Sequence, residues 1–345
     1  MKRAIIIGAG PAGLAVAAGL ARRDVAYTLL ERGPVSATAT RSIDPEMTLF
    51  SPTSLSKLHG MTLEPAGRRA TFAELVTALD RFRDDHAIEV TTGHAVTTVE
   101  RGGAGFAVRT ATGATFEGTH VINATGLAGS PRFPDDLDRA ALEIPAMHSV
   151  DVRRAHVAAS RRLLVVGAGA SAADVLAHWL AVRRPDDRAW IAVRSEVRAM
   201  RSSLLGIDLH YWLWLFEHLP GRPLGPKVTP KDAMWGREIP RAIARGDIVA
   251  VKTARFDATS VTLADGTVLE PDLIVFATGF RHDTRHLGDL IERDAAEWPI
   301  VRRNESVRTP GVFVLGARYA RNLASPFLRG IANDAEYVAA RIARG

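Results

Sequence analysis

The 345-residue sequence predicts an α/β protein with two units of the same design, each a parallel sheet flanked by helices. Two observations predict it. A short apolar segment, a glycine-rich turn and an apolar helix follow one another at the N-terminus, and the same order recurs from residue 163. Further along, an apolar segment ending in Ala-Thr-Gly follows each of them. With 47% apolar residues, the chain has enough apolar material for two domains.

The first glycine-rich turn follows the apolar segment 3–7 and has the composition of a dinucleotide site. Gly8 permits a tight turn, Gly10 permits the close approach of a pyrophosphate, and Gly13 permits the helix to pack on the sheet. The free N–H groups at the helix N-terminus then face the phosphates. The next predicted strand ends in Glu31, whose carboxylate would bind ribose hydroxyls and repel a 2′-phosphate. This turn therefore favours FAD or NAD over NADP.

The second glycine-rich turn, residues 167–172, repeats the first with one difference. Its following strand, residues 190–193, ends in Arg194 and Ser195 instead of an acid. A guanidinium group matches a 2′-phosphate through two parallel hydrogen bonds, which favours NADPH over NADH. A surface arginine in an arginine-rich chain is the alternative interpretation.

Composition excludes several kinds of chemistry. The chain has no cysteine, so disulfides, thiolate metal sites, iron–sulfur clusters and dithiol redox pairs are excluded, and any redox chemistry must come from a bound cofactor. The 11 histidines lack the spacing of metal ligands, so no metal is expected. The basic residues behind the net charge of +6 are scattered in pairs such as Arg22-Arg23, and no nucleic acid is expected as a partner.

No segment predicts export or membrane insertion. The N-terminal apolar stretch is interrupted by Gly8, Gly10 and Pro11, which is too early for a signal peptide. No stretch approaches the roughly 20 apolar residues that cross a bilayer. The sequence therefore predicts a cytoplasmic protein without stable membrane insertion, and it leaves a homodimer open.

Together these motifs resemble those of flavoproteins with two dinucleotide-binding domains, most closely the flavin-containing monooxygenases, including the plant type that oxidises indole pyruvate. The resemblance extends along nearly the whole chain. Residues 49–61 are similar to the segment that those enzymes lay beside the flavin ring. Residues 310–316 resemble their last strand, and residues 330–335 resemble the start of their C-terminal helix.

The resemblance implies a set of cofactor contacts for each nucleotide. For FAD they are Gly8, Gly10, Pro11, Ala12, Gly13, Glu31, Arg32, Val96, Ala124, Thr125, Gly126 and Gly316. For NADPH they are Gly167, Gly169, Ala170, Ser171, Ala172, Arg194, Ser195, Ala277, Thr278 and Gly279.

The order of the motifs implies two Rossmann-like dinucleotide-binding domains, with the NADPH domain inserted into the FAD domain. The FAD-binding domain is expected over residues 1–150 and 280–345, and the NADPH-binding domain over 151–279. Within the latter, residues 201–241 interrupt the pattern with an apolar helix that carries two tryptophans and then a proline-rich loop. We expect this insertion to be a substrate lid or pocket, buried packing or a dimer face, or a membrane contact.

The chain departs from the monooxygenase pattern in two places. Of the signature Phe-x-Gly-x-x-x-His only His148 remains, because Leu142 and Ile144 occupy the other two positions. The acid that many relatives carry after the last glycine is Ala317 here. Both departures bear on oxygen activation and leave nucleotide binding intact. We expect His148 to be a loop histidine near the hinge between the domains rather than a catalytic base.

The function predicted is that of an NADPH-dependent flavin monooxygenase, which oxygenates a small organic substrate with O2 through a flavin C4a-(hydro)peroxide. Such a site depends more on excluding water than on an acid or base. Ser54, Lys57 and His59 are the candidate catalytic residues beside the flavin. One alternative is an NADPH-dependent flavin reductase or oxidase of the thioredoxin-reductase-like type, passing electrons to ferredoxin, flavodoxin or a small acceptor. Another is a flavoprotein that only binds nucleotide and senses redox state.

Overall fold

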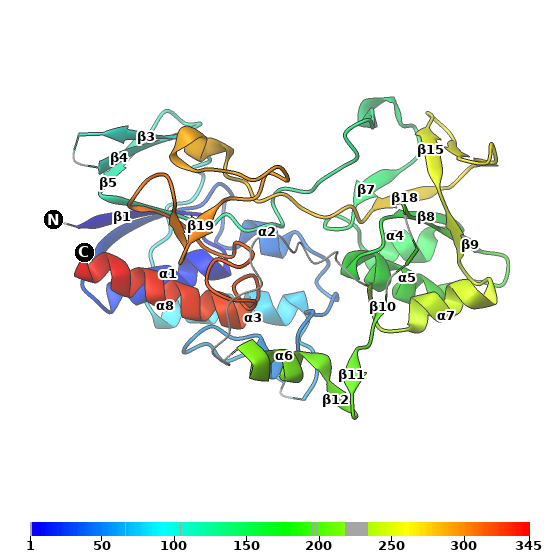
Figure 1. Cartoon of the computed structure of the whole chain (residues 1–345), viewed down its shortest axis with the longest axis horizontal. Coiled ribbons are helices and arrows are strands. Elements are labelled where there is room, and N and C mark those ends of the chain that lie inside the picture. The colour runs from blue at the N-terminus through cyan, green and yellow to red at the C-terminus, as the bar shows by residue number, and fades with distance from the viewer. Residues whose placement is uncertain (1, 66, 104, 195, 198, 218–233) are drawn as a thin grey trace. The chain divides into compact units, whose positions relative to one another are not determined.

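The computed structural model shows two compact units, each built around a largely parallel sheet (Figure 1). It describes residues 2–65, 67–103, 105–194, 196–197, 199–217 and 234–345. The first unit comprises the described residues within 1–130, 210–227 and 281–345, and the second those within 131–209 and 228–280. The second unit is therefore inserted into the chain of the first.

The sheet of the first unit has the strand order β19-β20-β21-β6-β1-β2. Its strands are β1 (Arg3–Ile7), β2 (Ala26–Leu30), β6 (His120–Asn123), β19 (Val301–Arg302), β20 (Glu305–Ser306) and β21 (Val312–Val314). The four strands from β21 to β2 are parallel, with Ile6 of β1 level with Leu29 of β2 and Ile122 of β6. Because neighbouring side chains of a strand point to opposite faces, this apolar sheet has two faces to cover.

Helices cover one face of the first sheet and a small antiparallel sheet covers the other (Figure 1). The helical layer consists of α1 (Pro11–Ala21), α3 (Phe72–Asp85) and α8 (Leu328–Arg344). The opposite layer consists of β3 (Val96–Gly102), β4 (Gly105–Thr110), β5 (Thr115–Gly118) and the 3-10 segment η3 (Arg285–Leu290). Short helical turns α2 (Thr38–Arg41) and η1 (Thr53–Leu55) complete this unit together with α6 (Leu209–Glu217). Gly19 lets α1 approach α8, since a Cβ there would lie 2.9 Å from the Cβ of Ala339.

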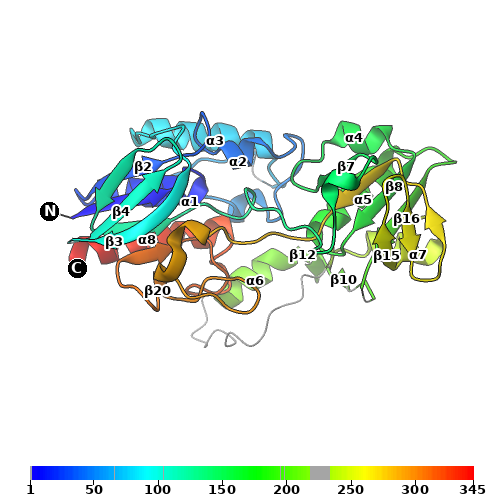
Figure 2. The same cartoon turned by 90° about the horizontal axis from the view of Figure 1, so that it is seen from above.

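The sheet of the second unit is entirely parallel, with the order β14-β9-β8-β18-β7. Its strands are β7 (Ala146–His148), β8 (Arg162–Val166), β9 (Arg188–Ala192), β14 (Val249–Val251) and β18 (Leu273–Phe276). One face packs on α4 (Arg154–Ala159), α5 (Ala170–Val182) and α7 (Glu238–Arg245). The other packs on the antiparallel β15 (Thr253–Phe256), β16 (Val261–Leu263) and β17 (Val268–Leu269), drawn in yellow (Figure 2). Smaller elements are η2 (Arg139–Ala141), β10 (Ala199–Met200), β11 (Ser203–Leu204), β12 (Ile207–Asp208) and β13 (Met234–Trp235).

The internal repeat is longer than the glycine-rich turns indicate. In each unit a three-stranded antiparallel sheet immediately precedes the parallel strand that ends in Ala-Thr-Gly, namely β3–β5 before β6 and β15–β17 before β18. Each unit thus has the same three layers in the same chain order. The predicted fold class, α/β with two Rossmann-like dinucleotide-binding domains and one inserted into the other, is confirmed.

Two segments lie in a different unit from the one the sequence analysis assigned. Residues 131–150, expected in the FAD domain, belong to the second unit, because β7 pairs with β18 in its sheet. The helix α6, expected within the 201–241 insertion of the NADPH domain, belongs to the first unit. The proline-rich loop that follows α6 lies outside the described residues. Among the helices that the structure describes, none has the length and apolar character needed to cross a membrane.

Candidate functional site

A cavity of 310 Å³ lies in the first unit at the carboxyl ends of its parallel strands, where open α/β sheets bind ligands. Of the predicted FAD contacts it is lined by Gly8, Gly10, Pro11, Ala12, Glu31, Arg32, Val96, Ala124, Thr125, Gly126 and Gly316. These residues come from the turn after β1, the end of β2, the start of β3, the turn after β6 and the end of β21. The fold thus brings five distant segments of the chain to one cavity.

The three glycines of the first turn have different surroundings. Gly8 has φ of +101°, and a Cβ there would lie 2.8 Å from the backbone oxygen of Ala124. A Cβ at Gly13 would overlap the backbone oxygen of Gly8, which explains why this glycine lies behind the turn and does not line the cavity. A Cβ at Gly10 would meet no atom within 4 Å. The protein itself therefore requires Gly8 and Gly13, whereas the open space at Gly10 is room for a ligand.

Glu31 is a buried carboxylate at the edge of the cavity. It accepts hydrogen bonds from the backbone N–H groups of Ala9, at 3.1 Å, and Gly33, at 3.0 Å. These bonds hold the carboxylate against the glycine-rich turn and leave acceptor capacity on both oxygens. A pair of ribose hydroxyls would use that capacity, and a phosphate would be repelled.

The lining residues that the sequence analysis missed include Asp283 and His286. The backbone oxygen of Asp283 accepts hydrogen bonds of 3.1 Å from Asn123 Nδ2 and Thr125 Oγ1, which ties the segment to the turn after β6. His286 is 9% exposed, and its Nε2 has no hydrogen-bond partner among the described residues. Burial lowers the pKa of His286 to about 4, so the ring is neutral near pH 7. A buried polar atom without a partner beside a cavity is a place for a ligand's hydrogen bond.

The second glycine-rich turn repeats the backbone of the first. Gly167 has φ of +115°, and a Cβ there would overlap the backbone oxygen of Ala277, the counterpart of Ala124. Gly169 begins α5 with φ and ψ of −89° and −169°, and Gly10 begins α1 with −79° and −169°. The predicted contacts Ala170, Ser171 and Ala172 form the first turn of α5. Each glycine-rich turn thus packs against its own Ala-Thr-Gly turn.

The Ala-Thr-Gly turn of the second unit is held from two sides. Thr278 Oγ1 donates a hydrogen bond to the backbone oxygen of Arg132, and Gly279 has φ of +86°. His148, at the end of β7, forms a 3.0 Å hydrogen bond through Nε2 with the backbone oxygen of Gly279. The His148 ring is fully buried and packs edge-on against Phe280, and burial lowers its pKa. The histidine therefore ends a buried strand rather than lying in a loop, and its contacts are structural.

Arg194 is exposed two residues beyond β9, and no ion pair is described for it in the part of the chain that the structure covers. A guanidinium group in this position is available for a ligand. Ser195, its predicted partner at the ribose corner, lies outside the described residues.

The candidate catalytic residues do not line the described cavity. Ser54, Lys57 and His59 are all exposed. Ser54 Oγ lies 2.7 Å from the hydroxyl of Tyr211 on α6, and His59 Nε2 lies 2.9 Å from Asn333 Oδ1 on α8. Two of the three thus have contacts that attach the segment 50–60 to helices, and their catalytic roles stay predictions.

The comparisons with known proteins agree with this architecture. The family model described as pyridine nucleotide-disulphide oxidoreductase matches residues 5–203, which is more than half of the chain. The chain belongs to this family. It is therefore an oxidoreductase, although it has no cysteine to form the disulphide of the family name.

Two curated relatives and one solved structure illustrate the match. "Uncharacterized oxidoreductase CzcO" from Bacillus subtilis (strain 168) is 24% identical over 348 residues, covering 98% of each chain. "Indole-3-pyruvate monooxygenase YUCCA4" from Oryza sativa subsp. japonica is 26% identical over 332 residues, covering 81% of this chain and 74% of the relative. The structure of "Flavin-containing monooxygenase from Stenotrophomonas maltophilia" has a TM-score of 0.79 at 24% identity, covering 100% of this chain and 99% of that one. The resemblance to the flavin-containing monooxygenases is confirmed.

Proposed function

We propose that the protein is an NADPH-dependent flavin monooxygenase that uses O2 to oxygenate a small organic molecule. FAD binds in the cavity of the first unit, and NADPH binds at the glycine-rich turn of the second. The similarity to a plant indole-3-pyruvate monooxygenase and to the fold of a bacterial flavin-containing monooxygenase supports the reaction class.

One observation carries the assignment of FAD to the first unit. The open space at Gly10 is next to the N–H groups that begin α1, and Glu31 is held beside the same turn at the edge of the cavity. A dinucleotide needs this combination, since its pyrophosphate requires N–H donors and its ribose requires an acceptor. His286 Nε2 supplies one further hydrogen-bonding atom beside the cavity. The residues present therefore fit FAD.

Each part of the chain would have a limited task in the reaction. Gly10 and the first turn of α1 would hold the pyrophosphate, Glu31 the ribose, and Arg194 the 2′-phosphate of NADPH. Bound FAD would supply the redox chemistry, accepting a hydride from NADPH and reacting with O2. The protein would orient the two nucleotides and exclude water from the place where they react.

The proposal is tested with purified protein and ¹⁸O2. The protein is expected to be yellow as isolated or after incubation with FAD, and to oxidise NADPH faster than NADH. Small amines, sulfides and ketones are then offered in parallel, and mass spectrometry is used to find one atom of ¹⁸O in a product. If all consumed O2 is recovered as hydrogen peroxide whatever the substrate, the protein is a reductase or oxidase. If it binds no flavin, the proposal fails at its first step.

A further inference from the structure

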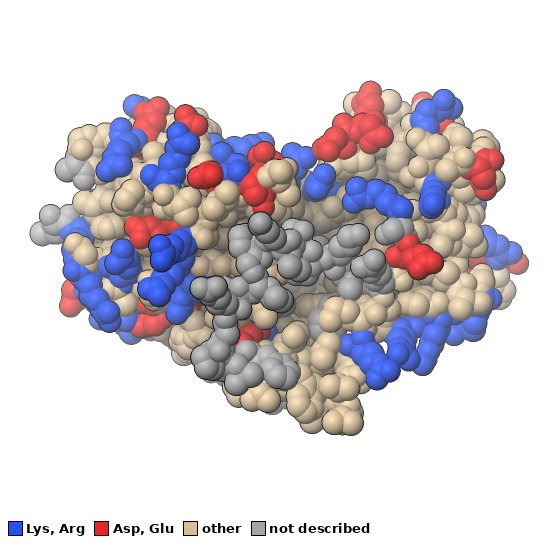
Figure 3. Space-filling view, in the orientation of Figure 1, with Lys and Arg blue, Asp and Glu red and all other residues tan. Residues whose placement is uncertain are grey.

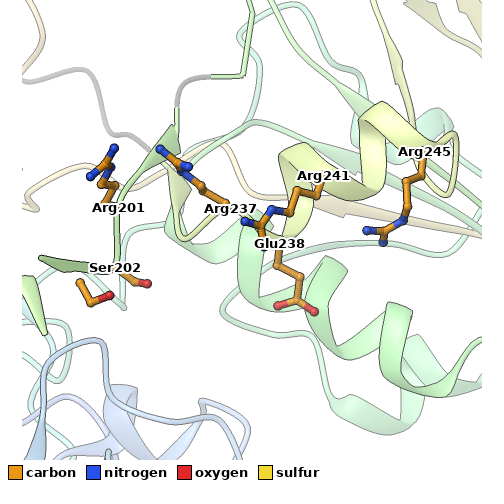
Figure 4. A pocket seen from close by; sticks show the side chains of 7 residues that line it. Arg201, Ser202, Arg237, Glu238, Arg241 and Arg245 are labelled. Atoms are coloured by element: carbon orange, nitrogen blue, oxygen red, sulfur yellow. The ribbon is translucent and has the colours of Figure 1, made fainter. Parts of the chain in front are cut away.

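The second unit contains a basic hollow whose residues are not among the predicted nucleotide contacts. It has a volume of 570 Å³ (Figure 4). Its lining consists of Arg201, Ser202, Ser203, Arg237, Glu238, Arg241 and Arg245. In the space-filling view basic side chains gather over the region of α7 (Figure 3). Within the described residues, the predicted NADPH contacts lie outside this lining.

The hollow is built by two short strands and one helix. β10 and β13 pair in parallel, with Met200 level with Trp235, so the chain leaves both strands at the same edge. Arg201 follows the first strand directly, and Arg237 follows the second after one glycine. Arg237 is also the residue before α7, and Arg241 and Arg245 continue from it at intervals of four. Residues four apart share one face of a helix, so the three side chains form one stripe.

The other face of α7 fixes the direction of this stripe. Ile239 and Ala242 are buried in the apolar core of the second unit. Because that side of the helix packs inward, the arginine stripe lies on another side of α7, and its three residues are among those that line the hollow (Figure 4). The position of the arginines is therefore set by the core and not by chance contacts of exposed side chains.

The charges of the hollow are only partly balanced by the protein. Arg245 Nε lies 2.8 Å from Asp247 Oδ2 and is already paired. For Arg201, Arg237 and Arg241 no ion pair is described in the covered part of the chain, and the acid in the lining is Glu238. Like charges four residues apart on a helix repel each other. Three guanidinium groups around one hollow, none with an ion pair to the described residues, thus favour an anion of more than one charge.

We propose that Arg201, Arg237 and Arg241 form a binding site for a phosphate group. The planar guanidinium group donates two parallel hydrogen bonds to phosphate oxygens, and the hydroxyls of Ser202 and Ser203 are further donors at the rim. Two sources share this chemistry: the 2′-phosphate of NADPH, and a separate phosphorylated small molecule or free phosphate. The first source rests on the proposed function and would replace Arg194 as the residue that holds the 2′-phosphate, whereas the second leaves that assignment unchanged.

The test measures phosphate and nucleotide binding separately by isothermal titration calorimetry of the flavin-loaded protein. The variant is the double substitution Arg237→Gln and Arg241→Gln. The control is Arg255→Gln, which removes an exposed arginine of the same unit that is paired with Asp257 outside the hollow. Inorganic phosphate is expected to bind the wild type and the control alike. In the double variant its Kd is expected to rise about tenfold or more, because each charged hydrogen bond lost costs of that order.

The nucleotide titrations then identify the source. If the 2′-phosphate is the ligand, the double variant loses affinity for NADPH and not for NADH, and NADPH displaces inorganic phosphate. If the ligand is separate, phosphate still binds the NADPH-saturated protein and the NADPH affinity of the variant is unchanged. Failure of the wild type to bind NADPH would contradict the proposed function and leave the phosphate titration as a valid test of the site.

Two further outcomes decide the proposal. Glu238→Gln removes the acid of the lining and is expected to tighten phosphate binding. Circular dichroism checks that each variant is folded, and Arg201→Gln serves as the second variant, since it changes a residue outside α7. Wild-type protein that binds no phosphate at low ionic strength, or variants that bind it as tightly as the wild type, would overturn the proposal.

Discussion

Two buried histidines in the first unit predict a loss of stability as the pH falls below 6.5. His282 is 4% exposed and His286 is 9% exposed. Burial lowers the pKa of each histidine to about 4, although the negative charge of Asp283 acts to raise it. For His286, the positive charges of Arg293 and Arg285 lower the pKa further. In the unfolded chain the same side chains titrate near 6.5. Between these values only the unfolded state takes up the two protons.

The sign and size follow from proton linkage. A histidine whose pKa is lowered by folding leaves stability unchanged above pH 6.5, and reduces it progressively as the pH falls from 6.5 to 4. At pH 5 a shift from 6.5 to about 4 corresponds to a loss of about 2 kcal/mol per histidine. His282 and His286 together would then remove about 4 kcal/mol, which is a large part of the stability of a typical domain.

The assay is urea unfolding followed by circular dichroism at pH 7.5 and pH 5.0, for the wild type and for His282→Leu and His286→Leu. Comparing the change with pH between proteins cancels the contributions of all other titrating groups. Each variant is expected to lose about 2 kcal/mol less than the wild type between the two pH values. His59→Gln replaces an exposed histidine and is the control, expected to follow the wild type. If all four proteins lose the same amount, neither buried histidine has the lowered pKa.

Substitutions at four positions test the nucleotide sites. Gly10→Val is expected to change the free energy of unfolding by no more than about 1 kcal/mol and to abolish flavin binding. Gly8→Val, at positive φ and close to Ala124, is expected to lower the free energy of unfolding by about 1–3 kcal/mol or more. Thermal melts and flavin absorbance separate the two variants, and equal destabilisation would contradict the geometry. His286→Leu, assayed at pH 7.5, is expected to weaken flavin binding about tenfold, as for a lost hydrogen bond, and unchanged retention would show that Nε2 does not face the ligand. Arg194→Ala is expected to raise the Kd of NADPH about tenfold and to leave the Kd of NADH unchanged, with Arg188→Ala as the control. An equal loss of affinity for both nucleotides would remove the 2′-phosphate assignment.

Features that depend on neighbouring residues in the sequence could be predicted. The turns at Gly8 and Gly167 could be predicted because strand, turn and helix follow one another in the sequence, although the backbone atoms that exclude a side chain there belong to Ala124 and Ala277, more than 100 residues later. The predicted strand 3–7 is β1, and the predicted helix after it is α1, which begins at Pro11. The position of Glu31 beside the glycine-rich turn could be predicted, because the end of a parallel strand has a fixed relation to the turn beside it.

Features that depend on distant pairing could not be predicted in the same way. β7 has three residues, and its membership of the second sheet comes only from its pairing with β18, more than 120 residues later. From the sequence, α6 is predicted to be part of an insertion. In the structure its Glu217 forms a nearly buried ion pair with Arg329 of α8, with Arg329 Nε and Glu217 Oε2 3.0 Å apart. His286 has no motif that marks it. A weak signal was available in the cluster of Asp283 with His282 and His286, directly after the predicted crossing between the domains.

The two turns share a backbone but differ in how the residue at the proposed ribose corner is held. Glu31 is buried and anchored by the N–H groups of Ala9 and Gly33, so it is fixed before any ligand arrives. Arg194 is exposed, and no ion pair is described for it within the described residues. A preorganised, buried site favours a cofactor that stays through many turnovers, and an exposed cation favours one that is released. In the proposed function FAD remains bound while NADPH enters and leaves in each cycle. The difference between Glu31 and Arg194 therefore matches the different residence times that this reaction requires of its two nucleotides.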